Sequence, residues 1–300
     1  NIVIASRFFL PFILFLLIYF LIRKLTHNKE LLSNKINAIA CGLFVLLGYD
    51  LIDFRTIFGY LRGGVPPGDF LIWSRPINPI LGAIFLITFL LLIWSIVRGE
   101  KRQKLSIFGA SIFLALMISS YFFSWGMAIS IAAVLVLIYL LKKEYKIVKN
   151  LIIVIIFGFL LSVPYWYSSW RASKSPWYHD SVLRSGLFQT HYPLLNKFTL
   201  AVLGIYLIFI FLPVFTRWIR REKITVHLED WHLFCLAFIL GSLWVYSQQI
   251  ITGITIWPYH FVQYSIPLAI IVLMVLFYNV IRKKSQILWK AGISVIIFAS

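Results

Sequence analysis

Three polar segments interrupt the long apolar runs of this sequence, and they hold most of the side chains suited to chemistry. They cover residues 53–76, 167–196 and 247–260. Aspartate and histidine accept protons or bind divalent cations. Arginine binds phosphate through two parallel hydrogen bonds, and amides and hydroxyls suit sugar hydroxyl groups. The three segments therefore supply the candidates for catalysis, phosphate binding and substrate binding.

Three aspartates are the candidate catalytic residues. Asp50 and Asp53 are three residues apart, so on a helix they share one face. Asp69 follows a turn rich in glycine and proline. At a membrane boundary such a carboxylate acts as a general base, or holds Mg²⁺ or Mn²⁺ beside a phosphate. In the structural alternative, Asp50 and Asp53 are a pair at a helix end that Arg55 or Arg7 neutralises, and Asp69 caps the local backbone.

Arg62 and Arg75 flank Asp69 in the stretch "RGGVPPGDFLIWSR". Because arginine grips a phosphate in a bidentate way, this loop is a candidate site for a lipid-linked phosphate at the membrane surface. An ordered surface or re-entrant loop is the alternative interpretation.

The segment 167–196 offers His179, Asp180 and His191 as a base with its orienting partner, or as metal ligands. It also begins beside a run of tyrosines and tryptophans, "YWYSSW". These rings suit stacking against sugars, although aromatic residues also form the ordinary belt at a membrane interface.

The stretch "SQQIITGITIWPYHF", residues 247–261, contains many hydrogen-bonding groups for a connection between apolar runs. Gln248, Gln249, Thr252 and His260 are neutral donors and acceptors of the kind that bind hydroxyl-rich ligands. The sequence therefore predicts a substrate-binding turn here. In the alternative interpretation, these polar groups bond to one another and close a turn between two helices.

Composition indicates what positions these residues. The chain is 61% hydrophobic and only 13% charged, which excludes an ordinary soluble domain. Apolar runs long enough to cross a bilayer recur, and in lipid they must be helices. We therefore predict an all-α, polytopic transmembrane helix bundle with long extracytoplasmic loops that contain short helices. Nine full spans and the start of a tenth are expected at 3–22, 34–52, 77–97, 105–123, 126–141, 150–167, 197–216, 231–247, 261–281 and 287–300.

Residues 1–300 are expected to form one transmembrane domain of a longer protein, because both ends of the sequence lie within apolar runs. Cys41 and Cys235 both fall within predicted spans, so neither a disulfide framework nor a zinc-binding spacing is present.

Basic residues predict the orientation. Alternate connections hold four basic residues in each of five groups, which accounts for 20 of the 28. Under the positive-inside rule these connections are cytoplasmic, so Asn1 and the three polar segments face outward. The net charge of +18 is then a topology signal, with the lipid bilayer and its anionic headgroups as partner and no nucleic acid.

This layout resembles the GT-C class of integral-membrane glycosyltransferases. The pieces "WSRPINPILGAIF", "SSYFFSWGMA", "LRSGLFQTHYP" and "QQIITGITIWPYHF" are also similar to bacterial multi-span proteins of that type. The resemblance implies an enzyme of the bacterial inner membrane that transfers a sugar from a polyprenyl-phosphate carrier to an acceptor outside. It also implies that Arg171 and Arg184, together with the two arginines beside Asp69, stabilise the departing phosphate.

Two other classes share the topology. An O-antigen polymerase or ligase would depend on arginine and histidine and would tolerate loss of every outer carboxylate. A transporter would place charged or helix-breaking residues near the middle of the membrane, in two related halves. The sequence contains no internal repeat, and span interiors such as "LIIVIIFGFLL" are uniformly apolar.

Overall fold

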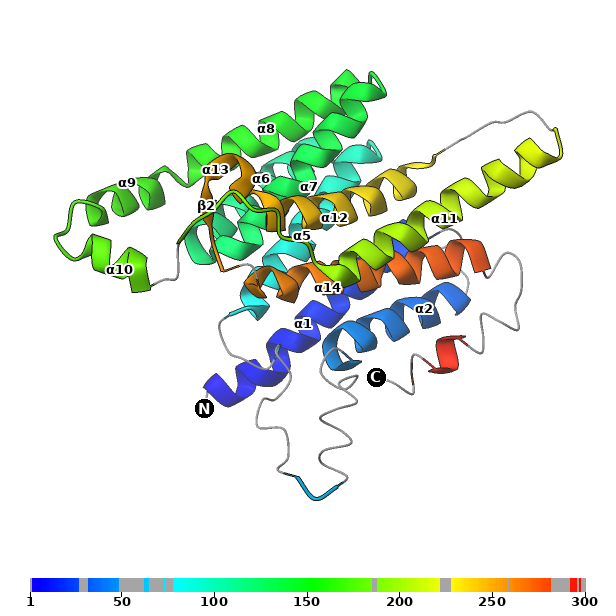
Figure 1. Cartoon of the computed structure of the whole chain (residues 1–300), viewed down its shortest axis with the longest axis horizontal. Coiled ribbons are helices and arrows are strands. Elements are labelled where there is room, and N and C mark those ends of the chain that lie inside the picture. The colour runs from blue at the N-terminus through cyan, green and yellow to red at the C-terminus, as the bar shows by residue number, and fades with distance from the viewer. Residues whose placement is uncertain are drawn as a thin grey trace. The chain divides into compact units, whose positions relative to one another are not determined.

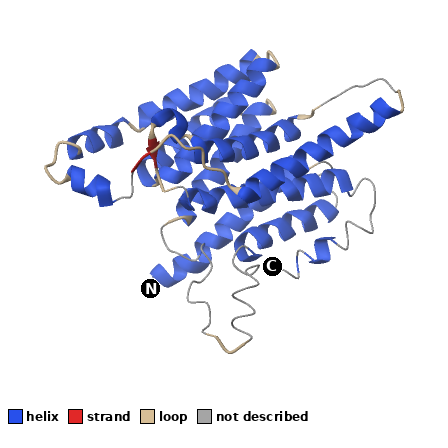
Figure 2. Ribbon diagram, in the orientation of Figure 1, coloured by secondary structure: helices blue, strands red, loops and turns tan. Residues whose placement is uncertain are grey.

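The computed structural model of the chain describes residues 2–26, 32–48, 62–64, 73, 78–184, 188–221, 228–257, 259–281, 292–295 and 297. The described chain is all-α apart from two two-residue strands, which confirms the predicted fold class (Figures 1 and 2). The helices are α1 (Ile2–Leu25), α2 (Leu32–Leu43), α5 (Ile80–Val97), α6 (Gln103–Ser120), α7 (Phe122–Leu141), α8 (Tyr145–Leu161), α9 (Val163–Ala172), α10 (Tyr178–Arg184), α11 (Lys197–Ile219), α12 (Asp230–Ser247), α13 (Gln249–Thr252) and α14 (Tyr259–Leu276). The π-helical segments are η1 (Phe44–Gly48) and η3 (Phe277–Ile281), and the strands are β1 (Phe188–Gln189) and β2 (Ile254–Thr255).

Seven of the described helices are long and apolar enough to cross a membrane, or eight if the bent pair α8 and α9 is one span. These helices fit a multi-pass membrane protein in contact with lipid. Two predicted spans, 34–52 and 287–300, extend into residues that the structure does not describe. The described part of the first is a shorter apolar helix, Leu32–Leu47.

The chain divides into two compact units, one of residues 1–87 and 270–300 and the other of residues 88–269. In the first unit, α1 packs against α2, where a Cβ added to Gly42 would lie 2.7 Å from the Phe15 ring. The Trp73 indole donates a hydrogen bond of 2.9 Å to the carbonyl of Val45 in η1. A π-helical segment departs from the α-helical hydrogen-bond pattern, and here a side chain supplies a donor to one of its carbonyls.

The second unit is built around α12. In an 18-residue window within Asp230–Thr252, 61% of the residues are buried, whereas the corresponding share for α11 is 18%. α12 packs closely on α7, because a Cβ added to Gly241 would lie 2.9 Å from the backbone N and Cα of Ile131. Small residues allow such close approach between membrane helices. α6 and α8 pack on each other and on α7, and α11 packs on α12.

The predicted span 150–167 does not continue as one straight helix. α8 ends at Leu161, and α9 starts at Val163 with a bend of 50° between them. Pro164 explains the break, because proline has no N–H to donate to the preceding turn and its ring clashes there. Proline is tolerated in the first turn of a helix, which is its place in α9. The predicted span 150–167 therefore runs across this bend.

The contact between α7 and α12 predicts a large effect from one methyl group. Gly241→Ala should lower the free energy of unfolding by about 1–3 kcal/mol, because the new Cβ meets backbone atoms that cannot rotate away. Gly204→Ala in α11 is the matched control, since a Cβ there meets nothing within 4 Å. Thermal unfolding in detergent compares the two. Equal melting temperatures for both variants would contradict the packing described.

Candidate functional site

The helices of the second unit bring polar side chains together at two opposite ends. At one end, which we call the Asp230 end, the start of α12 meets Arg98 after α5 and Lys142 after α7. At the other, the His191 end, Ser247 of α12 donates a 2.7 Å hydrogen bond to the carbonyl of Leu194. Two of the basic connections predicted to be cytoplasmic thus share one end of this unit, and parts of the predicted outer segments share the other.

The His191 end joins two segments that are far apart in the sequence. β1 pairs antiparallel with β2, with Phe188 opposite Thr255 and Gln189 opposite Ile254 (Figure 2). The amide of Thr190 donates to the carbonyl of Gly253, which extends the pairing by one residue. The segment 188–194 and the turn 247–255, both predicted as outer loops, therefore form one surface. We call this surface the loop seam.

His191 has a fixed ring orientation on the loop seam. Its Nδ1 lies 3.2 Å from the carbonyl oxygen of Ile250, and a carbonyl only accepts, so Nδ1 carries the proton. Neutral His191 therefore presents its Nε2 as the basic atom. The side chain is exposed, and its ring lies close to Gly253, where an added Cβ would come within 3.1 Å of Cε1. This geometry suits a proton acceptor or a ligand for a polar group.

The predicted ligand-binding amides and hydroxyl of the turn bond mostly to the protein. Gln249 is 1% exposed and donates to the carbonyl of Tyr192 over 2.8 Å. Thr252 donates to Gln248 Oε1 over 2.7 Å, and Gln248 donates to the carbonyl of Ile254 over 2.8 Å. Gly253 ends α13 with φ = 69°, a left-handed conformation that glycine adopts without strain. The geometry follows the alternative interpretation, in which these groups close the turn.

His260 lies in an aromatic cluster at the same end. Its Nδ1 is 3.2 Å from the hydroxyl of Tyr121, and its ring stacks on Phe123 at 4.7 Å between centroids. The Trp257 ring is 5.9 Å away and tilted. His260 thus joins the start of α14 to the turn between α6 and α7, and it is only half-buried.

The remaining predicted site residues are dispersed. His179 and Asp180 lie in the first turn of α10 and are exposed, Arg171 is exposed at the end of α9, and Arg184 is the last residue of α10. Arg62 is exposed in the other compact unit. Outside the described residues lie Asp50, Asp53, Asp69 and Arg75.

The structure assembles no metal centre from the residues that it describes. Across that part of the chain, no three histidine, cysteine, aspartate or glutamate side chains gather where they could hold an ion. His179, Asp180 and His191 therefore do not form a three-ligand set.

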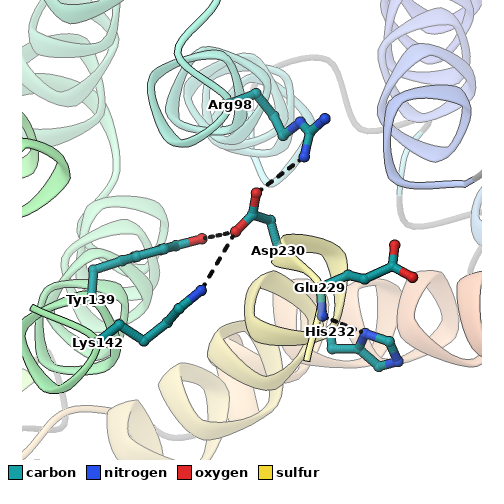
Figure 3. Close-up of polar contacts among 6 residues, drawn as sticks. All are labelled: Arg98, Tyr139, Lys142, Glu229, Asp230 and His232. Atoms are coloured by element: carbon teal, nitrogen blue, oxygen red, sulfur yellow. Dashed lines mark hydrogen bonds and ion pairs between the residues drawn. The ribbon is translucent and has the colours of Figure 1, made fainter. Parts of the chain in front are cut away.

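The Asp230 end holds a polar cluster that the sequence interpretation missed (Figure 3). One carboxylate oxygen of Asp230 accepts a 3.1 Å hydrogen bond from Arg98, and the other lies 3.2 Å from the Tyr139 hydroxyl, which donates to it. The Lys142 ammonium is 3.9 Å from that second oxygen. The carboxylate lies at a helix N-terminus and the two cations follow helix C-termini, so each charge also suits its helix dipole.

The residues on either side of Asp230 cap the start of α12. The amide of Glu229 donates to His232 Nδ1 over 3.2 Å, while the Glu229 side chain accepts from the His232 amide, which completes a capping box (Figure 3). The acidic pair in "HLEDWH", placed directly before an apolar run, was the signal for this helix start. No local pattern pointed to Arg98, which lies 132 residues earlier.

Comparisons of the chain with models of known protein families, with curated proteins and with solved structures find no match.

The Asp230 cluster predicts a stability effect. Asp230→Asn should lower the free energy of unfolding by about 1–2 kcal/mol, because two cations lose their counter-charge at a half-buried site. The loss should shrink at high salt, which screens charge pairs. Asp180→Asn is the control, since Asp180 is exposed and makes no ion pair within the described residues. Equal stability of the two variants in denaturant titrations would contradict a structural role for the cluster.

The loop seam predicts a local effect. Gln249→Leu removes the donor to Tyr192 and should speed hydrogen exchange at the Thr190 amide by roughly tenfold, because the two segments separate more easily. Gln248→Leu is the control, because its bonds stay within the turn 248–254. Mass spectrometry of peptides after hydrogen exchange measures the exchange rate in both variants. Unchanged protection at residues 188–194 in the first variant would show that Gln249 does not hold the seam.

Proposed function

We propose that this protein transfers a sugar from a polyprenyl-phosphate carrier to an acceptor at the extracytoplasmic face of the bacterial inner membrane. The observation that carries the proposal is the loop seam, where the two predicted outer segments meet in one surface at 188–194 and 247–255. A transferase of this kind needs an oriented proton acceptor at the membrane surface, next to groups that bind phosphate and sugar.

Exposed aromatic and basic groups in the same unit favour a lipid-linked, carbohydrate substrate. Trp170, Trp177 and Tyr178 are exposed on α9, α10 and the turn between them, together with Arg171. Flat rings suit the faces of sugars, and guanidinium suits phosphate. The basic connections at the Asp230 end favour placing that end in the cytoplasm, with Asn1 outside.

The reaction is a single displacement. A base removes the proton of the acceptor hydroxyl, whose oxygen bonds to the anomeric carbon while the bond from that carbon to the phosphate oxygen breaks. The electron pair leaves with the phosphate, and arginine stabilises its growing negative charge. Asp50, Asp53 and Asp69 are the proposed carboxylate bases, and a divalent cation would share the charge on the phosphate.

A polymerase or ligase that joins lipid-linked glycans is the second candidate. The orientation of His191 favours it, because such an enzyme would use histidine and arginine in place of a carboxylate. The two candidates therefore differ in the residue that accepts the proton.

One set of variants separates the candidates. Purified protein in proteoliposomes receives a panel of polyprenyl-phosphate-linked sugars and glycans, and product is measured for Asp50→Asn, Asp53→Asn, Asp69→Asn and His191→Gln. Loss of one carboxylate base or of the His191 base should lower kcat by about 10²–10⁴-fold, the range of general base catalysis. Lys101→Gln is the control, because this exposed side chain lies after α5 at the Asp230 end, away from the proposed site.

Each outcome has one meaning. Loss in an aspartate variant alone supports the glycosyltransferase, and loss in the His191 variant alone supports the polymerase or ligase. Undiminished turnover in all four variants, or no turnover by the parent protein on any donor, would overturn the proposal.

A further inference from the structure

The helix α9 and the turn after it, residues 163–177, form an exposed extension of the second unit, which we call the α9 arm. It leaves the end of α8 with a bend of 50°, and α9 has no buried residue. In Figure 1, α9 extends away from the other helices of this unit. A water-soluble helix normally buries one face against its own protein. The described residues of the second unit do not cover the face of this helix, so its side chains must meet something else.

Three of the four aromatic residues of α9 share one face, and the fourth, Tyr165, lies on the other side. Val163, Trp166, Tyr167 and Trp170 are related by steps of three or four residues, which places them on one side of a helix. Ser168 lies on the opposite side. The tip of this face is open, because Tyr167 is 58% and Trp170 57% exposed.

The root of the arm is fixed to the bundle. Trp166 donates a 2.9 Å hydrogen bond to the hydroxyl of Ser162, stacks on Phe159 and meets Trp125 of α7 edge-on. These contacts hold α9 at its angle to α8. The arm is therefore a positioned element of the unit, with a face of defined direction.

The surface beside the arm is apolar. The last turns of α8 expose Ile156, Phe157 and Leu160, as expected for a helix side in contact with acyl chains. α9 continues directly from this helix, so its aromatic face begins where the lipid-facing surface ends. Tryptophan and tyrosine are the residues favoured at that depth, where one part of the ring is in apolar surroundings and the polar atom is in water.

Two cations border the aromatic face. Arg171 follows Trp170 directly, and the Lys174 ammonium lies 5.6 Å from the Trp170 ring centroid. Basic side chains beside interfacial aromatic rings reach anionic headgroups while their stems lie along apolar surface. Their charge is complementary to that of anionic phospholipids.

We propose that the α9 arm lies in the headgroup layer of the bilayer at the His191 end, with Tyr167 and Trp170 toward the acyl chains and Arg171 and Lys174 on anionic phospholipid headgroups. The bilayer itself is the occupant of the exposed face. This placement follows from the bend, the aromatic face and the two cations, and it gives Trp170 and Arg171 a lipid contact in place of the substrate contact considered above.

Site-directed spin labelling tests the depth of the arm. Cys41 and Cys235 are both fully buried, so a single cysteine introduced on the arm is labelled selectively. Trp170→Cys and Ser168→Cys report opposite faces of α9, and Tyr167→Cys is a second reporter of the aromatic face. The full chain is placed in nanodiscs of phosphatidylcholine with or without phosphatidylglycerol. Collision rates of the nitroxide with oxygen and with a water-soluble nickel chelate are then measured.

The expected result is a ratio of oxygen to nickel collisions that is several-fold higher at 167 and 170 than at 168. Equal and high nickel access at all three positions would place the arm in water and overturn the proposal. Protection of 167 and 170 from both reagents, together with spin–spin broadening between copies, would show that a second copy covers the face and would also overturn it.

The headgroup contact is tested separately. Phosphatidylglycerol should draw the label at position 170 deeper into the bilayer. Arg171→Gln combined with Lys174→Gln should abolish this change in depth. Lys101→Gln combined with Arg102→Gln is the matched control, because both residues are exposed after α5 at the opposite end. A label depth that changes with neither phosphatidylglycerol nor the double substitution would refute the anionic contact.

Discussion

The hydrocarbon layer constrains everything else in this molecule, because it offers no partner to a polar group. Backbone groups inside it must bond within their own helix, so the apolar runs become helices and the irregular chain is confined to their ends. Polar side chains follow the same rule. In the second unit they gather at the Asp230 end and at the His191 end, and the helix interiors between them pack through apolar and small residues such as Gly241.

The two ends of that unit are held by different forces. At the Asp230 end a single carboxylate joins three helix termini, and each charge also complements the helix end on which it lies. At the His191 end the contacts are neutral hydrogen bonds and stacked rings, including the His260 ring on Phe123. Fixed charges therefore hold the first end, whereas neutral hydrogen bonds and ring contacts hold the second.

The geometry also reduces the number of predicted site residues whose hydrogen-bonding groups are left for a substrate. Gln248, Gln249 and Thr252 use hydrogen-bonding groups on the protein itself, so they shape the loop seam rather than extend from it. His191 differs, because one ring nitrogen bonds to a backbone carbonyl and the other makes no hydrogen bond within the described residues. A held ring loses little freedom when it accepts a proton, which is the property expected of a base at a membrane surface.

The sequence by itself determined the all-α class, most of the apolar helices and the alternation of connections between two ends. These features depend on apolar length and on charge near each helix end, which are local properties. The sequence also contained the signal for the break after α8, because the effect of Pro164 is local. The predicted span nevertheless ran past that break. Only the tertiary structure decided which polar groups meet. The partners of Asp230 and His191 lie 132 and 59 residues away, and such pairings depend on how helices pack rather than on any pattern within one segment.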